Sequence, residues 1–249
     1  MVTADTDSFL RMGLAVHFNA TQSIVQALGV AIVTGQYADK AFPTEKALCL
    51  QFDAARTIVR EAVKMLAAKG LITSRRRQGI RIAPEDDWNL FDPDVLNWLL
   101  ERSQSPELLL DFLEMRLAVE PAAAALAARY ASPAQKTAIR SAIERMYAAE
   151  RGEDDGLTAD IAFHIAVLNA SGNRFFKQMR VMIATALAIS IRYTNRIQGR
   201  QASAPDHGRV ADAICDGDTV RARETMQWLL EGAQQLVTSQ ITVQPSAPV

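Results

Sequence analysis

The most constraining feature of this chain is a pair of short helices followed by a basic hairpin, within residues 42–81. Pro43 and Thr44 supply an N-terminal stop and cap for the first helix, in FPTEKALCLQF. A tight connection leads into the second, AARTIVREAVKMLAAKG, which Gly70 closes in the helix-ending position. The strand-like segments LITS and GIRIA then flank a basic turn at 75–78. This order of elements predicts a winged helix-turn-helix.

The second of these helices carries two parallel stripes. Arg56, Arg60 and Lys64 fall four residues apart, so they lie along one face. A neighbouring apolar stripe must pack on the rest of a small domain; its members are Val59, Ala62, Val63 and Leu66. A helix that is buried on one side and basic on the other suits the major groove of DNA.

Positive charge is concentrated in this part of the chain. The whole sequence holds 27 Lys and Arg against 28 Asp and Glu, with a formal net charge of −1. Residues 40–81 contain ten basic and three acidic residues, a balance of +7, so the other 207 residues sum to −8. A basic module on an acidic body is the electrostatic footprint of nucleic-acid binding. The alternative for Arg75, Arg76 and Arg77 is a merely solvated turn.

The length of 249 residues suits two domains, each with its own core. We expect a mainly α fold, in which an N-terminal winged helix-turn-helix precedes a C-terminal all-α antiparallel helical bundle. The expected parts are a flexible arm (1–19), the DNA-binding domain (20–84), a linker with a short helix (85–104), the helical effector-binding and dimerisation domain (105–240) and a disordered tail (241–249).

Cysteine usage and hydropathy indicate where such a protein works. Cys49 and Cys215 are too few and too far apart for a disulfide framework, which favours a reducing cytoplasm. The N-terminus places Asp5 and Asp7 before Arg11 and has no signal-peptide core. Because no segment approaches eighteen uninterrupted apolar residues, we expect a cytoplasmic protein without a membrane partner.

Beyond the linker the chain is almost wholly helical in pattern. Alanine-rich apolar faces and short breaks favour an antiparallel bundle. The predicted helices span about 106–130, 134–150, 156–171, 174–197, 206–215 and 218–239.

One constellation in this bundle has metal-ligand spacing. Asp160 and His164 are four residues apart, so on a helix their side chains point the same way, among apolar neighbours. His207, at the start of a later helix, could supply a third ligand. The spacing is compatible with half of a divalent-metal site or with a buried Asp–His hydrogen bond.

A second constellation is an arginine on the inward row of the helix LLLDFLEMRLAVEPAAAALAA. That row consists of Leu109, Phe112, Leu113, Arg116, Glu120, Ala123 and Ala127. A buried guanidinium needs an acidic partner or a bound anion, so Arg116 either pairs with Glu120 or binds a ligand. Arg192 poses the same question, with a solvated helix end as the favoured alternative.

Together these segments resemble the GntR family of bacterial transcription regulators, in its FadR subfamily with an FCD-type all-helical C-terminal domain. The resemblance covers about residues 20–240. It rests on IVTGQY, FPTEKAL, ARTIVREAVKMLAAKGLI and the wing RRRQG, then on EMRLAVEPAAAALAA, DIAFH, ASGN and the histidine ahead of ADAICDGD. The linker sequence WNLFDPDVLNWLLE resembles a branch that responds to sugar acids, which implies an aldonate such as galactonate as effector.

The resemblance also implies how DNA is contacted. The matching DNA-binding positions are Lys46, Arg56, Thr57 and Arg60, with Arg75, Arg76, Arg77, Gln78 and Gly79 as the wing. Arg56 and Arg60 could provide bidentate guanine contacts or phosphate anchors. Family members bind near-palindromic operators as homodimers, so the expected partners are double-stranded operator DNA and a second copy of the chain.

Many relatives hold a metal with one Asp and three His, and Asp160, His164 and His207 match three of these positions. The fourth falls on Leu229, which cannot ligate. Either a bound acid completes the coordination of a divalent ion, most readily Zn²⁺, or no metal binds and Arg116 holds the carboxylate together with the histidines. The expected effector-binding residues are Arg116, Asp160, His164 and His207 in both cases.

We expect the protein to be a homodimeric repressor and not an enzyme. A sugar acid would release this repressor from its operator. Binding of the acid would shift the linker around Asp92 to Arg102. A metal-dependent hydrolase is the main rival, because three N/O ligands with an open position also describe catalytic sites. No additional general base or nucleophile motif supports it. A transcriptional activator would fit the same residues, as would a DNA-binding scaffold without an effector.

Overall fold

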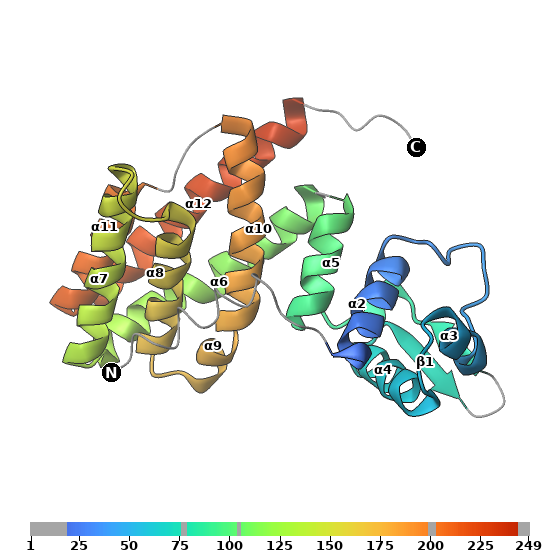
Figure 1. The fold of residues 1–249 in the computed structure, drawn as a ribbon. Coiled ribbons are helices and arrows are strands. Elements are labelled where there is room, and N and C mark those ends of the chain that lie inside the picture. Colours follow the sequence, from blue (N-terminus) through green and yellow to red (C-terminus); the bar gives the residue numbers. More distant parts are fainter. Residues whose placement is uncertain (1–18, 76–78, 104–105, 199–202, 244–249) are drawn as a thin grey trace. The chain divides into compact units, whose positions relative to one another are not determined.

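The computed structural model describes residues 19–75, 79–103, 106–198 and 203–243. They form two compact units, which divide between Ser103 and Gln104. The first unit combines helices with one hairpin, and the described part of the second consists of helices (Figure 1). The predicted mainly α fold is confirmed. Most of the expected arm, 1–18, and positions 244–249 of the expected tail lie outside the described residues.

The first unit contains the predicted helix pair. Its elements are α2 (Ala20–Val33), α3 (Glu45–Gln51), α4 (Arg56–Ala68), β1 (Ile72–Arg75), β2 (Gly79–Ile82), the 3-10 turn η2 (Glu85–Asp87) and α5 (Pro93–Ser103). The Thr44 side chain caps α3 by accepting a hydrogen bond from the Ala47 amide at 3.3 Å. Gly70 follows α4 with φ +79°, and a Cβ there would lie 2.3 Å from the Asp87 carbonyl oxygen, so glycine is required.

The two stripes of α4 separate as the sequence predicts. Its buried residues are Val59, Ala62, Val63 and Leu66. They pack toward α2 and α3, where Leu28 and Leu48 are fully enclosed. The basic stripe of Arg56, Arg60 and Lys64 is exposed. Burial of one stripe therefore fixes which face of α4 is presented to solvent.

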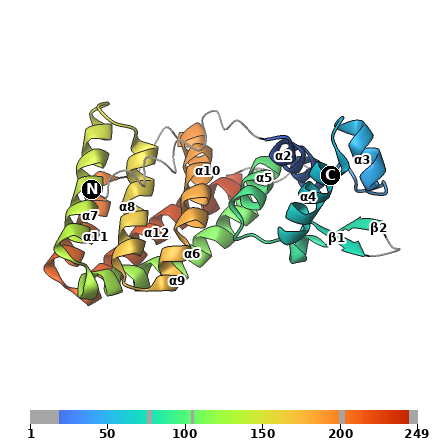
Figure 2. The ribbon, with the colours of Figure 1, turned by 60° about the horizontal axis from the view of Figure 1, so that its bottom comes forward.

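Strands β1 and β2 form an antiparallel hairpin after α4 (Figure 2). Ile72 pairs with Ile82 at its base, and Arg75 pairs with Gly79 at its far end. Ile72 is buried while the outer part of the hairpin is exposed. The hairpin is the wing that the basic turn predicts.

Residues 85–103, expected to be a linker with a short helix, pack closely within the first unit. Trp98 of α5 is buried, and its indole N–H donates to Gln26 Oε1 at 2.9 Å. The indole ring lies so close to Gly29 of α2 that a Cβ there would be 2.3 Å from it. Lys69, at the end of α4, donates to Asp92 and Asp94 at 2.7–2.8 Å. These contacts join α5 to both α2 and α4.

The second unit is built from long helices. They are α6 (Pro106–Tyr130), α7 (Pro133–Glu150), α8 (Gly156–Ala170), α9 (Arg174–Gln178), α10 (Arg180–Gln198), α11 (Ala204–Asp216) and α12 (Thr219–Val243). Where the sequence predicts one helix over 174–197, the structure has α9 and α10. The amide of Met179 bonds back to the Phe175 and Phe176 carbonyls, which closes α9 after one short turn.

Helix packing in this unit brings three helices to one centre. α6 lies along α12, and α7 contacts both α8 and α11 (Figures 1 and 2). α6 also contacts α8 and α11. The inward residues of α6, α8 and α11 therefore meet inside the bundle. No helix among the described residues is both long enough and apolar enough to cross a membrane.

Candidate functional site

The predicted DNA-contacting residues lie on one exposed part of the first unit. Lys46 belongs to α3, whereas Arg56, Thr57 and Arg60 occupy the first turns of α4, and all four are exposed. Arg56 forms an ion pair with Glu45 at 3.4 Å, although 78% of the arginine side chain is exposed. An exposed pair of this kind contributes little to stability, so it can yield to a phosphate or a base edge.

The wing is described only in part. Arg75 ends β1, and the exposed Gly79 begins β2 with φ +77°. A positive φ at the first residue after the turn suits glycine in a hairpin. Arg76, Arg77, Gln78 and the side chain of Arg75 lie outside the described residues.

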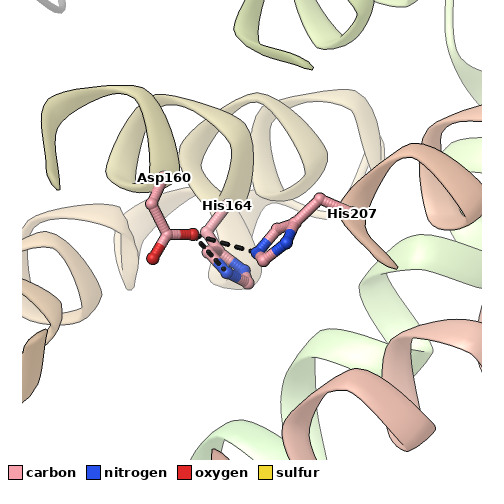
Figure 3. A group of neighbouring side chains, drawn as sticks. All are labelled: Asp160, His164 and His207. Carbon is pink, nitrogen blue, oxygen red and sulfur yellow. Dashed lines mark ion pairs between the residues drawn. The ribbon is translucent and has the colours of Figure 1, made fainter. Parts of the chain in front are cut away.

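A second group of charged residues is buried in the helical unit. Its members are Arg116 and Glu120 from α6, Asp160 and His164 from α8, and His207 from α11; each is at most 4% exposed. Figure 3 shows both imidazole rings turned toward the Asp160 carboxylate. The predicted convergence of Asp160, His164 and His207 is confirmed, since one ligand atom of each lies within 4.8 Å of the others.

His207 is held from behind by the backbone. Its Nδ1 lies 2.8 Å from the Ser203 carbonyl oxygen, in the first turn of α11. Because a carbonyl oxygen only accepts hydrogen bonds, Nδ1 carries a proton. In the neutral ring Nε2 then presents its lone pair, and this atom lies 3.0 Å from Asp160 Oδ1. The backbone thus fixes both the orientation and the tautomer of His207.

His164 is held in the same way by a side chain. Its Nδ1 contacts Glu120 Oε2, and its Nε2 lies 3.3 Å from the same Asp160 Oδ1. A carboxylate also accepts only, so the proton again belongs on Nδ1. Phe163 packs edge-on against both rings, with centroid separations of 5.3 Å to His164 and 5.0 Å to His207. Both Nε2 atoms are therefore directed at one oxygen.

That oxygen has no aligned hydrogen bond. Asp160 Oδ1 is buried, and although two imidazole nitrogens lie 3.0 and 3.3 Å away, neither contact meets hydrogen-bond geometry. A buried carboxylate oxygen without a donor is costly. When both imidazoles are neutral, their Nε2 atoms and Asp160 Oδ1 are three neighbouring acceptors, an arrangement that a cation between them would satisfy.

Arg116 completes the group on the side of α6. Its Nε and Nη2 donate to the Glu120 carboxylate, and Nη2 lies 3.1–3.2 Å from both ring nitrogens of His164. The predicted inward orientation of Arg116 is confirmed, and Glu120 is its acidic partner.

The pKa values follow this arrangement. Burial on its own would raise the pKa of Glu120, but the charges of Arg116 and His164 lower it to about 2. Burial likewise opposes ionisation of Asp160, yet its interaction with His164 and His207 lowers its pKa. Burial tends to lower the pKa of His164, whereas the Glu120 charge raises it above its usual range. Both carboxylates are therefore ionised at neutral pH.

Sequence reasoning identified four of these five residues as ligand-binding but assigned Glu120 only to Arg116. Its contact with His164 spans 44 positions and joins two helices, so spacing within one helix could not reveal it. Leu229, at the expected fourth ligand position, is half-buried on α12. The side chain of Arg192 lies outside the described residues.

Comparison with known proteins supports the division into two parts. Residues 20–82 match the family model of bacterial regulatory proteins of the gntR family, and residues 111–232 match the FCD domain. The chain is 36% identical over 207 residues to the galactonate operon transcriptional repressor of Escherichia coli (strain K12), covering 80% of this chain and 90% of that protein. It is also 31% identical over 198 residues to a protein of the same strain named as a putative L-lactate dehydrogenase operon regulatory protein. That alignment covers 74% of this chain and 72% of the other protein.

Among solved structures, the regulator Lar of Listeria monocytogenes aligns with a TM-score of 0.59 at 15% identity, over 90% of this chain and 99% of that one. This likeness supports the fold alone. The relatives are transcription regulators rather than enzymes, which removes the metal-dependent hydrolase as an alternative. The chain therefore belongs to the GntR family of bacterial transcription regulators, with a DNA-binding winged helix-turn-helix domain and an effector-binding FCD domain.

Proposed function

We propose that this regulator is a homodimeric repressor whose helical domain holds a divalent metal and, with it, a 2-hydroxy acid that releases operator DNA. The convergence of two imidazole Nε2 atoms on the unsatisfied oxygen of Asp160 carries the proposal. The similarity to a galactonate operon repressor supports repression as the sign of the response.

The donor set fits a metal such as Zn²⁺. Asp160, His164 and His207 offer one oxygen and two nitrogens, which zinc accepts readily. Each histidine is oriented through Nδ1 by a carboxylate or a backbone carbonyl, as metal-ligating histidines commonly are. Because Leu229 supplies no ligand, three protein donors would leave part of the coordination sphere to a small molecule.

Charge balance favours an anionic effector. Arg116 and Glu120 cancel each other, and Asp160 contributes one negative charge to the buried group. Because metal ligation requires neutral imidazoles, a divalent metal would leave the group at +1, which one carboxylate neutralises. Since Glu120 already occupies Arg116, we favour the metal over the guanidinium as the anchor for the acid.

The class of acid follows from the names of two relatives. Galactonate and L-lactate are both 2-hydroxycarboxylates, which carry a carboxylate and an adjacent hydroxyl oxygen. Oxygen donors of this kind can complete a metal site that has three protein ligands. A sugar acid such as an aldonate remains our first candidate, because the galactonate operon repressor is the more similar of the two relatives.

DNA binding would use the exposed face of α3 and α4. A two-fold dimer would present two copies of α4 to a near-palindromic operator. The effector must bind more tightly to the arrangement that does not fit DNA, and a tenfold loss of operator affinity requires about 1.4 kcal/mol of coupling.

Calorimetry tests the site directly. We expect chelator-treated protein to bind Zn²⁺, and the zinc-loaded protein to bind galactonate or L-lactate. Propionate, which is L-lactate without the hydroxyl group, should bind at least about tenfold more weakly, the equivalent of 1.4 kcal/mol. Equal binding of L-lactate and propionate would exclude recognition of a 2-hydroxy acid, and failure to bind zinc would exclude the metal.

A further inference from the structure

We infer that Glu120 determines the specificity of the effector site by cancelling the charge of Arg116, so that the site accepts an acid with a single carboxylate. This inference rests on the proposed metal and effector site. It assigns to Glu120 a function beyond holding His164, and it predicts which acids the site rejects.

The positive charge of Arg116 is paired with the Glu120 carboxylate. The guanidinium Nε and Nη2 both donate to the Glu120 carboxylate. Arg116 is 3% exposed and Glu120 is 1% exposed. Nη2 also lies 3.1–3.2 Å from the two ring nitrogens of His164. Arg116 therefore borders the metal-ligand group with its positive charge already compensated.

The pairing of the Arg116 and Glu120 charges has a large effect because both residues are buried. Water and salt screen exposed charges over about 10 Å at 0.1 M ionic strength, but they screen a buried group much less. A dicarboxylate placed in a group of charge +1 would leave an excess negative charge inside the bundle, which burial disfavours. A monocarboxylate leaves none. The pair of Arg116 and Glu120 thus sets the number of carboxylates that the site tolerates.

The substitution Glu120→Gln tests the effect of the Glu120 charge separately from the effect of its side-chain shape. Glutamine retains an oxygen that can accept from His164 Nδ1 and an almost unchanged side-chain volume, while it removes the negative charge. Arg116 then keeps an uncompensated charge, and the zinc-loaded group changes from +1 to +2. Arg116→Gln moves it to 0, and the double variant returns it to +1.

The decisive experiment compares L-lactate with L-malate, which differ by one carboxylate, on zinc-loaded wild type and variants by calorimetry. We expect wild type to prefer L-lactate and Glu120→Gln to shift the ratio of the two affinities toward L-malate by about tenfold, or 1.4 kcal/mol. Arg116→Gln should weaken both acids. The double variant should regain the wild-type preference, which a purely structural effect of losing Glu120 would not allow.

Zinc affinity of the metal-free proteins gives an independent readout. Removing a negative charge should weaken zinc binding in Glu120→Gln by about tenfold, and removing the positive one should strengthen it in Arg116→Gln. The double variant should match wild type. Asp154→Asn serves as the control, because Asp154 pairs with Arg145 at 2.9 Å outside the buried group; it should change neither quantity.

The outcomes separate this inference from the proposed function. If zinc-loaded wild type binds neither these two acids nor galactonate, the proposed effector class is wrong. If wild type prefers L-lactate and Glu120→Gln keeps that preference, only the inference on Glu120 is wrong. Should Glu120→Gln fail to fold, the comparison of Arg116→Gln with the double variant decides, since an equally weak double variant would overturn the charge-balance argument.

Discussion

The two functional regions of this regulator use charge in opposite ways. On the face proposed to bind DNA, Arg56 is 78% exposed, and its ion pair with Glu45 is long, at 3.4 Å. In the helical domain, Arg116 and Glu120 are almost fully enclosed and bonded to each other. Exposed charges act through their number and remain available to a polyanion, whereas buried charges must balance. We therefore expect the first region to respond to the charge density of a polyanion and the second to distinguish ligands that differ by a single charge.

The largest effect should come from removing a ligand of the buried group. His207→Ala should lower zinc affinity by more than about 100-fold, because outer-shell partners alone are worth roughly 10–100-fold in metal sites. Competition against a chelating dye measures this change. Asp154→Asn, which alters an ion pair outside the buried group, is the control and should leave zinc affinity unaltered. Equal affinities of the two variants would remove His207 from the site.

Removing a single exposed arginine of α4 should have a smaller but measurable effect on operator affinity. Arg60→Ala should weaken specific operator binding by about 1–3 kcal/mol and leave the helical domain folded. Fluorescence anisotropy with a promoter fragment at two salt concentrations measures the loss. Arg221→Ala is the control, because Arg221 is exposed in the helical domain, where it pairs with Asp216. If Arg60→Ala binds as tightly as the control, α4 does not enter the groove.

The packing of α5 on α2 can be broken by one methyl group. Gly29→Ala would place a Cβ 2.3 Å from the Trp98 ring, which is enclosed and cannot retreat freely. Overpacking of this kind should destabilise the DNA-binding unit by about 1–3 kcal/mol. Urea unfolding followed by tryptophan fluorescence would detect it, and an unchanged midpoint would show that α5 does not pack there.

The smallest effect on stability should come from a glycine-to-alanine substitution in the helical domain, which can be compared with Gly29→Ala. Gly232 lies within α12, and a Cβ added there would have no neighbour within 4 Å among the described residues. Gly232→Ala should stabilise by up to about 1 kcal/mol through helix propensity. A rise in the unfolding midpoint of the helical domain is the expected result, and a fall comparable to that of Gly29→Ala would contradict the packing described for α12.

Sequence reasoning succeeded where local rules decide the structure. The cap at Thr44, the end of α4 at Gly70 and the burial of Val59 each depend on neighbours within a few residues. It also placed Arg116 on the inward row of α6, because the helical period alone determines that face.

It was less informative where distant segments meet. The acidic, proline-containing sequence around Asp92 is typical of a linker, yet α5 is held by Trp98 against Gly29 and by the Lys69 ion pairs. The contact between Glu120 and His164 depends on how α6 packs against α8. Such contacts follow from tertiary packing, for which single-helix periodicity carries no signal.

Operator release is the measurement that tests the central claim most directly. Full-length protein bound to its own promoter fragment is titrated with galactonate and L-lactate, after zinc loading and after chelation. We predict that at least one of the two acids lowers the affinity for DNA about tenfold or more with zinc, the equivalent of 1.4 kcal/mol of coupling, and has no effect after chelation. Release that is equally strong in the chelated protein, or no release by either acid with zinc present, would contradict the account.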